Sequence, residues 1–246
     1  MKPLIAGNWK MHKMISEAVD WVCEVKRRLT SPLSADVVVF PPFTALGCVY
    51  DQLKDSSIIL GAQNVGPGSS GSFTGEVSVD MLRDVGCRYV LIGHSERRIL
   101  FDETDEMINS RIKAASTMNF IFCIGETTEQ RNQGRTEEVI REQLEKGLKG
   151  LKVKDAQQSL TVAYEPVWAI GTGVTAEPFQ AQGVHGFIRN WLIDAFGSGE
   201  IRILYGGSVS SNNSGVLLAQ KDIDGLLVGG ASLNAADFCA IIDSAC

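Results

Sequence analysis

The sequence predicts an α/β protein in which residues 1–246 form one domain, a (β/α)8 barrel. The first observation behind this prediction is a set of eight short apolar segments spread evenly along the chain. The second is that helical repeats lie between them, at roughly thirty residues per unit, the size of a right-handed βα repeat. The third is that no linker-like stretch or change of composition divides the sequence.

The apolar segments are almost continuously hydrophobic and do not alternate with polar residues. This pattern is typical of parallel strands that are covered on both faces. We expect strands at PLIAGNW (3–9), DVVVF (36–40), IILGAQ (58–63), RYVLIG (88–93), FIFCIG (120–125), LTVAY (160–164), IRILY (201–205) and GLLVG (225–229).

Three of the segments between the strands carry apolar residues at the helical spacing of three and four. Thr136 is expected to cap the second of these helices, with acidic residues in its first turn, and Pro178 to begin the third. The repeats are Ala18, Val22, Val25 and Leu29; Ile140, Leu144, Leu148 and Leu151; and Val184, Phe187, Ile188, Leu192 and Phe196.

A doubly wound open sheet is the alternative arrangement of alternating strands and helices. That fold commonly carries a GxGxxG fingerprint directly after its first strand, and this sequence has none there. Eight units in about 250 residues favour the barrel.

The composition, with 44% hydrophobic and 21% charged residues, is that of a globular protein. A net charge of −6 argues against a nucleic-acid surface, which needs clustered lysine and arginine. No uninterrupted apolar run reaches about 18 residues, so no membrane-spanning helix is expected. The six cysteines show no CxxC or metal-binding spacing, which favours free thiols and a cytoplasmic protein.

Polar residues follow several predicted strands at the end where barrels of this kind carry their functional groups. Asn8 and Lys10 end the first strand, His94 follows the fourth and Glu165 ends the sixth. Asn8 and Lys10 are two residues apart, so they share a face if the extended geometry continues. We therefore expect these four side chains to lie together at one mouth of the barrel.

Paired glycines follow the last two predicted strands, Gly206-Gly207 before Ser208, and Gly229-Gly230. Backbone N–H groups that glycine leaves accessible at the start of a helix form an anion site. A tight turn explains either pair alone, but two pairs on neighbouring strands favour a phosphate site.

Glu165 ends a strand predicted to be buried, and a carboxylate there can act as a general base, above all when it is desolvated. The segment Pro166–Gly173 that follows is expected to form a flap over it, with an apolar middle between a stiff end and a flexible end. Closure of this flap would remove water from the base.

Two further side chains can act on a substrate beside that base. Lys10 can stabilise negative charge that develops on a substrate oxygen. His94 opens a predicted helix, whose N-terminus disfavours imidazolium, so we expect a neutral ring that donates a hydrogen bond. His12 and His185 lack such a setting and are interpreted as structural.

These residues belong to motifs that extend from the first strand to the last helix. In these motifs the sequence resembles the triosephosphate isomerase family. The motifs are GNWKM (7–11), QNV (63–65), FTGEVS (73–78), GHSERR (93–98), CIGET (123–127), AYEPVWAIGTG (163–173), YGGSV (205–209) and LVGGASL (227–233).

The resemblance implies interconversion of dihydroxyacetone phosphate and glyceraldehyde 3-phosphate, with no metal and no organic cofactor. It implies that Glu165 moves a proton between neighbouring carbons, that neutral His94 polarises the carbonyl group and that Lys10 offsets negative charge. Asn8 would orient the substrate. By the same resemblance, the phosphate would be held by Gly171, Ser208, Gly229 and Gly230, with Ser95 and Glu96 supporting the histidine.

The segment from Gln63 to Glu76 is long for a loop in a compact barrel, which usually indicates a function. The resemblance implies a homodimer in which this loop inserts into the second copy. Thr74 would then reach toward Asn8 and Lys10 of that copy. Val174 departs from the lysine usual in the family, which leaves the rate of flap motion open.

The residues alone leave two rival functions open. One is another phosphate-binding barrel enzyme, such as a sugar-phosphate epimerase or an aldolase. An aldolase needs a Schiff-base lysine inside the barrel, and Lys10 is the only lysine at a predicted strand end. The other rival is a non-catalytic barrel scaffold, which would be expected to have lost Lys10, His94 or Glu165, and all three are present.

Overall fold

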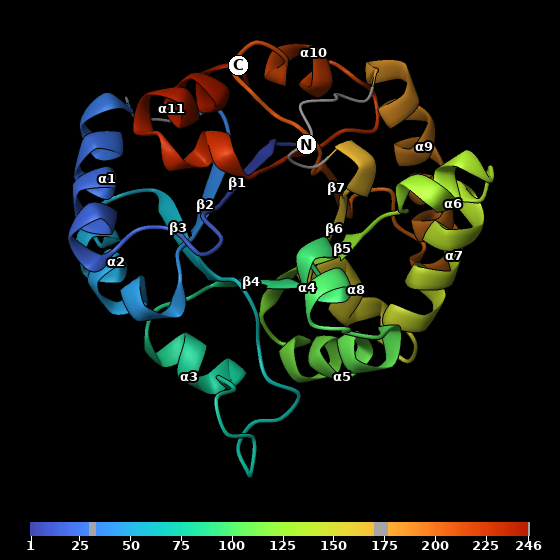
Figure 1. Cartoon of the computed structure of the whole chain (residues 1–246), viewed down its shortest axis with the longest axis horizontal. Helices are drawn as coiled ribbons and strands as arrows, with labels where there is room; N and C mark the ends of the chain where they lie inside the picture. The colour runs from blue at the N-terminus through green and yellow to red at the C-terminus, as the bar shows by residue number, and fades with distance from the viewer. Residues whose placement is uncertain (30–32, 170–176, 246) are drawn as a thin grey trace.

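The structure, a computed structural model, describes residues 1–29, 33–169 and 177–245. Across these ranges, eight parallel strands form a closed barrel in which each strand pairs with the next and β8 returns to β1 (Figure 1). The predicted (β/α)8 barrel is confirmed. The strands are β1 (Leu4–Asn8), β2 (Asp36–Phe40), β3 (Ile58–Ala62), β4 (Tyr89–Ile92), β5 (Asn119–Ile124), β6 (Leu160–Tyr164), β7 (Arg202–Tyr205) and β8 (Gly225–Val228).

Helices surround the barrel on all sides (Figure 1). The α-helices are α1 (Ile15–Arg28), α2 (Leu46–Leu53), α3 (Val79–Asp84), α4 (Ser95–Leu100), α5 (Asp105–Ala115), α6 (Thr128–Asn132), α7 (Thr136–Gly147), α8 (Val153–Ser159), α9 (Pro178–Phe196), α10 (Ser214–Leu218) and α11 (Ala235–Asp243). Short 3-10 helices are η1 (Phe43–Ala45), η2 (Val167–Ala169) and η3 (Gly230–Leu233).

The strands separate two apolar layers. Leu4 and Ala6 of β1 belong to a cluster made by strand residues alone, inside the barrel. Ile5, between them, belongs to the larger cluster that joins the strands to the helices. Since both faces of each strand are apolar, the strand sequences show no polar alternation.

Several boundary predictions were wrong. One residue at one or both ends separates the observed from the predicted bounds of β1, β3, β4, β5, β7 and β8. β1 ends at Asn8, before Trp9. Thr136 is the first helical residue of α7, and Arg135 takes the capping position, where its guanidinium pairs with Glu138 one turn further on. The apolar repeat of α7 continues to Leu151, but the helix ends at Gly147, because the chain turns at residues 148–150.

Two further expectations concern membranes and thiols. Within the described residues, no helix combines the length and the apolar character that crossing a bilayer requires. Cys23, Cys48, Cys87, Cys123 and Cys239 are all free thiols, as expected.

The two histidines interpreted as structural differ in their surroundings. His12 is exposed on the connection between β1 and α1, whereas His185 on α9 is fully buried. The Nδ1 atom of His185 donates a hydrogen bond to the Asp222 carbonyl oxygen at 3.1 Å, and the ring packs against Tyr164 and Tyr205. Burial lowers the pKa of His185 from 6.5 to about 4.

The lowered pKa of His185 predicts a loss of stability in acid. Between pH 6.5 and about 4 the unfolded chain binds a proton that the folded chain excludes, so stability falls as the pH falls through this window. The full shift corresponds to roughly 3 kcal/mol. Urea unfolding at neutral pH and near pH 4 should therefore show a smaller acid-induced loss for His185→Gln than for wild type, at equal protein concentration. An equal loss in both proteins would contradict the assignment.

Candidate active site

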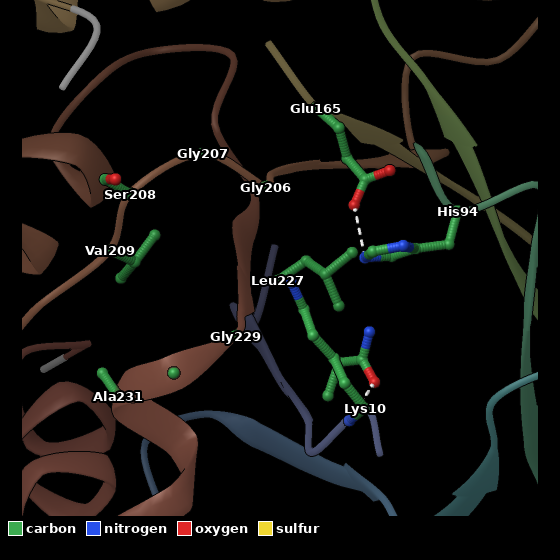
Figure 2. A pocket seen from close by; sticks show the side chains of 12 residues that line it. Lys10, His94, Glu165, Gly206, Gly207, Ser208, Val209, Leu227, Gly229 and Ala231 are labelled. Atoms are coloured by element: carbon green, nitrogen blue, oxygen red, sulfur yellow. Dashed lines mark hydrogen bonds and ion pairs between the residues drawn. The ribbon is translucent and has the colours of Figure 1, made fainter. Parts of the chain in front are cut away.

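A cavity of about 250 Å³ opens at the carboxyl ends of the strands (Figure 2). Its walls come from β1 and β8 and from the connections that follow β1, β4, β6, β7 and β8. Most of the predicted site residues line this cavity. They are Asn8, Lys10, His94, Glu165, Ser208, Gly229 and Gly230. Gly171 lies outside the described residues.

Glu165 and His94 point toward each other in this cavity (Figure 2). Nε2 of His94 lies 3.0 Å from Oε1 of Glu165. The other carboxylate oxygen, Oε2, accepts a hydrogen bond from the backbone N–H of Ser95 at 2.8 Å. Glu165 is 2% exposed, so both of its oxygens are held by protein groups in a nearly dry position.

Opposing influences set the charge on Glu165. Burial raises the pKa of its carboxyl group, whereas a charge on His94, the His94 and Ser95 hydrogen bonds and Lys10 hold the pKa below its usual value. With a neutral His94, the two hydrogen bonds and Lys10 still favour the ionised carboxylate that a general base requires. The same contacts weaken its basicity, so the carboxylate becomes a stronger base only when it leaves them.

Burial and Glu165 shift the pKa of His94 in opposite directions. Burial lowers its pKa, whereas the charge and hydrogen bond of Glu165 raise the pKa and prevail. However, Nδ1 of His94 accepts the backbone N–H of Glu96 at 3.2 Å, at the start of α4. This hydrogen bond favours a neutral ring, because a proton on Nδ1 would oppose the Glu96 N–H in a buried place, although Oε2 of Glu96 also lies 3.7 Å from Nδ1. In the neutral form that this geometry favours, the proton lies on Nε2 and is donated to Glu165.

Lys10 reaches the cavity by a turn. The expectation that extended geometry continues to Lys10 is wrong, because its φ is 54°, in the left-handed region. The Asn8 side chain causes the turn by accepting the Lys10 N–H on Oδ1 at 3.0 Å. The Lys10 ammonium group donates to Oε1 of Glu96 at 2.6 Å, so Glu96 supports both the lysine and the histidine.

Two glycines make room for Glu165. A Cβ atom on Gly206 would lie 2.8 Å from Cγ of Glu165, and a Cβ atom on Gly125 would lie 1.8 Å from the Glu165 carbonyl oxygen. Both distances are too short for real contacts. Gly206 was interpreted only as part of an anion site, and the structure adds this steric requirement.

The two glycine pairs lead into different local structures. Gly229-Gly230 runs directly into η3, as expected for a pair ahead of a helix. Gly206-Gly207 does not, because α10 begins only at Ser214. The expectation of a helix N-terminus at the first pair was therefore wrong.

Asn213 organises the connection after β7 in place of a helix. Its Oδ1 accepts the Ser210 N–H at 2.8 Å, and its Nδ2 donates to the Ser208 carbonyl oxygen at 2.9 Å. The Ser208 hydroxyl donates to the Ala169 carbonyl oxygen at 2.8 Å, which ties this connection to the base of the flap. Loop composition alone offered no signal for this role of Asn213.

Glu126 was missed as a functional residue, although it lies in the motif CIGET. Its fully buried carboxylate accepts hydrogen bonds from the Tyr164 hydroxyl, at 3.1 and 3.0 Å, and from Nε1 of Trp168, at 3.0 Å. Arg131 completes the cluster with an ion pair at 3.2 Å and a position 4.2 Å above the Trp168 ring. Glu126 thereby connects the end of β5 to the end of β6, through Tyr164, and to Trp168 of η2. Its position just after a strand end was the available signal.

Thr74 lies far from this cavity within its own chain. The connection from β3 to α3 projects beyond the ring of helices, and Thr74 and Phe73 are exposed on it (Figure 1). Thr74 was predicted to approach Asn8 and Lys10 of a second copy, and this stays a prediction.

The arrangement is suited to proton transfer beside a bound anion. It combines a carboxylate, an imidazole, an ammonium group and two glycine-containing connections around one cavity. In the described part of the chain, no three His, Cys, Asp or Glu side chains are placed to hold a metal ion.

Comparison with known proteins shows which family this chain belongs to. The sequence model of the family described as triosephosphate isomerase matches residues 3–245. The chain belongs to the triosephosphate isomerase family. Triosephosphate isomerase from Carboxydothermus hydrogenoformans is 53% identical, over 98% of this chain and 98% of that protein. Triosephosphate isomerase from Syntrophotalea carbinolica is 51% identical, over 98% of this chain and 97% of that protein.

A solved structure agrees with this family. The crystal structure of triosephosphate isomerase from Bartonella henselae superposes with a TM-score of 0.90 at 35% sequence identity, covering 99% of both chains. Membership of the triosephosphate isomerase family disfavours the epimerase, aldolase and scaffold alternatives.

Proposed function

We propose that this protein interconverts dihydroxyacetone phosphate and glyceraldehyde 3-phosphate through an enediolate, with Glu165 as the base. The observation that carries the proposal is the pairing of a buried carboxylate with an imidazole at 3.0 Å in one cavity, with the imidazole Nδ1 accepting a backbone N–H group. Members of the triosephosphate isomerase family at about 50% identity support the choice of substrate.

Glu165 takes a proton from a substrate carbon and returns it to the neighbouring carbon. One of its oxygens must first leave Ser95 or His94, because both oxygens are engaged. Leaving these donors strengthens the base at the moment when it faces the substrate. The lack of a side chain at Gly206 gives the Glu165 side chain the room that it occupies before this movement.

His94 polarises the substrate carbonyl by donating from Nε2 once Glu165 has turned away. A neutral ring suits this task, because it can donate its Nε2 proton to one oxygen of the enediolate and then take a proton from the other oxygen. Triosephosphate isomerase is itself the standard example of a neutral catalytic histidine. Lys10 offsets the negative charge of the enediolate, and Asn8 orients the substrate beside it.

The phosphate group is assigned to the connections after β7 and β8. Ser208, Gly229 and Gly230 lie there on the cavity wall, close to Lys10, whose Cε would lie 3.5 Å from a Cβ on Gly229. Gly171 of the flap completes this proposed set. Holding the phosphate while the proton moves opposes its expulsion from the enediolate.

Glu165→Gln tests the assignment of the base. The amide cannot accept a carbon-bound proton, so turnover should fall by about 10²–10⁴, whereas the affinity for a phosphate-bearing inhibitor should change little. A coupled assay of glyceraldehyde 3-phosphate isomerisation measures the first and calorimetry the second. Glu145→Gln, an exposed carboxylate on α7, is the matched control and should behave as wild type. Turnover that is unchanged in Glu165→Gln would reject the assignment.

The proposal includes a homodimer built through the 63–76 loop, with Thr74 directed at Asn8 and Lys10 of the second copy. The exposed apolar side chains of Phe73, Met11 and Met14 support it, since such surface is usually covered by a partner. The free thiols favour a cytoplasmic location.

Phe73→Ser tests this interface. Phe73 is 47% exposed, and losing its burial in both symmetric copies should cost about 2 kcal/mol, or roughly 30-fold in the dimer dissociation constant. Sedimentation at nanomolar concentrations measures this constant. Phe179→Ser, which changes a phenylalanine 71% exposed at the start of α9, should leave it unaltered. A wild-type protein that sediments as a fully active monomer would disprove the dimer.

A further inference from the structure

The backbone of Lys10 is held in a conformation that a lysine does not adopt by itself. Its φ of 54° lies in the left-handed region, where the Cβ atom of a non-glycine residue crowds the backbone. Such a conformation persists only where surrounding contacts determine it fully. Asn8 holds the N–H of Lys10, and Glu96 holds its ammonium group.

Gln63 holds the remaining backbone group of Lys10. Its Nε2 donates to the Lys10 carbonyl oxygen at 2.8 Å and to the Phe40 carbonyl oxygen at 2.9 Å. Both partners are acceptors, so the amide NH₂ group and not its oxygen must face them. Gln63 is the first residue after β3, and Phe40 ends β2. The amide thus ties the turn at Lys10 to the ends of two strands.

The two side-chain contacts act on opposite sides of the same residue. Asn8 fixes the peptide before Lys10 and Gln63 the peptide after it, so together they define the direction in which the lysine side chain leaves the backbone. Loss of the Gln63 contact frees the Lys10 carbonyl and allows φ to return to negative values. The ammonium group, at the end of a long flexible side chain, would then be displaced from the cavity.

We propose that Gln63 is a positioning residue for Lys10, keeping its left-handed turn and hence its ammonium group in place for charge stabilisation. This inference rests on the proposed role of Lys10 in the isomerase reaction. Gln63 itself does not face the cavity and need not touch the substrate.

The test compares kcat and KM of wild type, Gln63→Met, Lys10→Met and the double variant. Methionine keeps the length of the side chain but donates no hydrogen bond. We expect Gln63→Met to lower kcat/KM by about 10- to 100-fold and to raise KM, as a displaced binding group does. In the Lys10→Met background the same change should alter kcat/KM by less than about threefold, because a residue that acts through Lys10 has nothing left to position.

Glu76→Gln is the matched control for general loosening of the loop. Glu76 binds Arg111 through both carboxylate oxygens at the other end of the segment that begins with Gln63. A dimer or fold that is only weakened lowers the active fraction, and so kcat, without changing KM. We expect an unchanged KM for Glu76→Gln, with sedimentation confirming the same oligomeric state in every assay.

Three results would overturn the inference. The first is a wild-type KM and kcat/KM in Gln63→Met, and the second is a KM that rises equally in Glu76→Gln. The third is a double variant in which the two losses multiply. Wild-type activity in Lys10→Met is a different outcome, since it would refute the proposed role of Lys10 on which the inference depends.

Discussion

Two backbone N–H groups at the start of α4 are the constraint on which the site depends. The N–H of Ser95 donates to Glu165, and the N–H of Glu96 donates to Nδ1 of His94. The first favours an ionised carboxylate and the second a neutral imidazole with its proton on Nε2. One helix end therefore favours a charged carboxylate beside an uncharged imidazole, whereas burial alone would favour the uncharged form of both groups.

The same hydrogen bonds hold the base in a resting position. A carboxylate bound to Ser95 and His94 has a lowered pKa and no free oxygen directed at a substrate. In the proposed mechanism Glu165 leaves one of these donors before it takes the substrate proton, and its basicity rises as it does so. The Glu126 cluster, which binds both the end of β6 and Trp168, places the base and the flap on one support.

The sequence predicted the barrel because strands covered on both faces have an apolar signature, and it predicted the site because functional groups gather at strand ends. Its errors have physical causes. The left-handed conformation at Lys10 was not predicted, because the residue is not a glycine. After Gly206-Gly207 the chain forms an irregular connection, held by hydrogen bonds of the Asn213 side chain, where a helix was expected. The partners of Glu126 and Gln63 come from other strands, so only the folded chain shows them.

The most direct test of this account is the protonation state of the His94 ring, measured by nitrogen-15 NMR on histidine-labelled protein from about pH 5 to pH 9. The chain has three histidines, so a His94→Gln spectrum assigns the signals. At and above neutral pH we predict a neutral His94 with its proton on Nε2, opposite in tautomer to His185, whose Nδ1 donates to a carbonyl oxygen. Protons on both nitrogens of His94 near neutral pH would contradict the account.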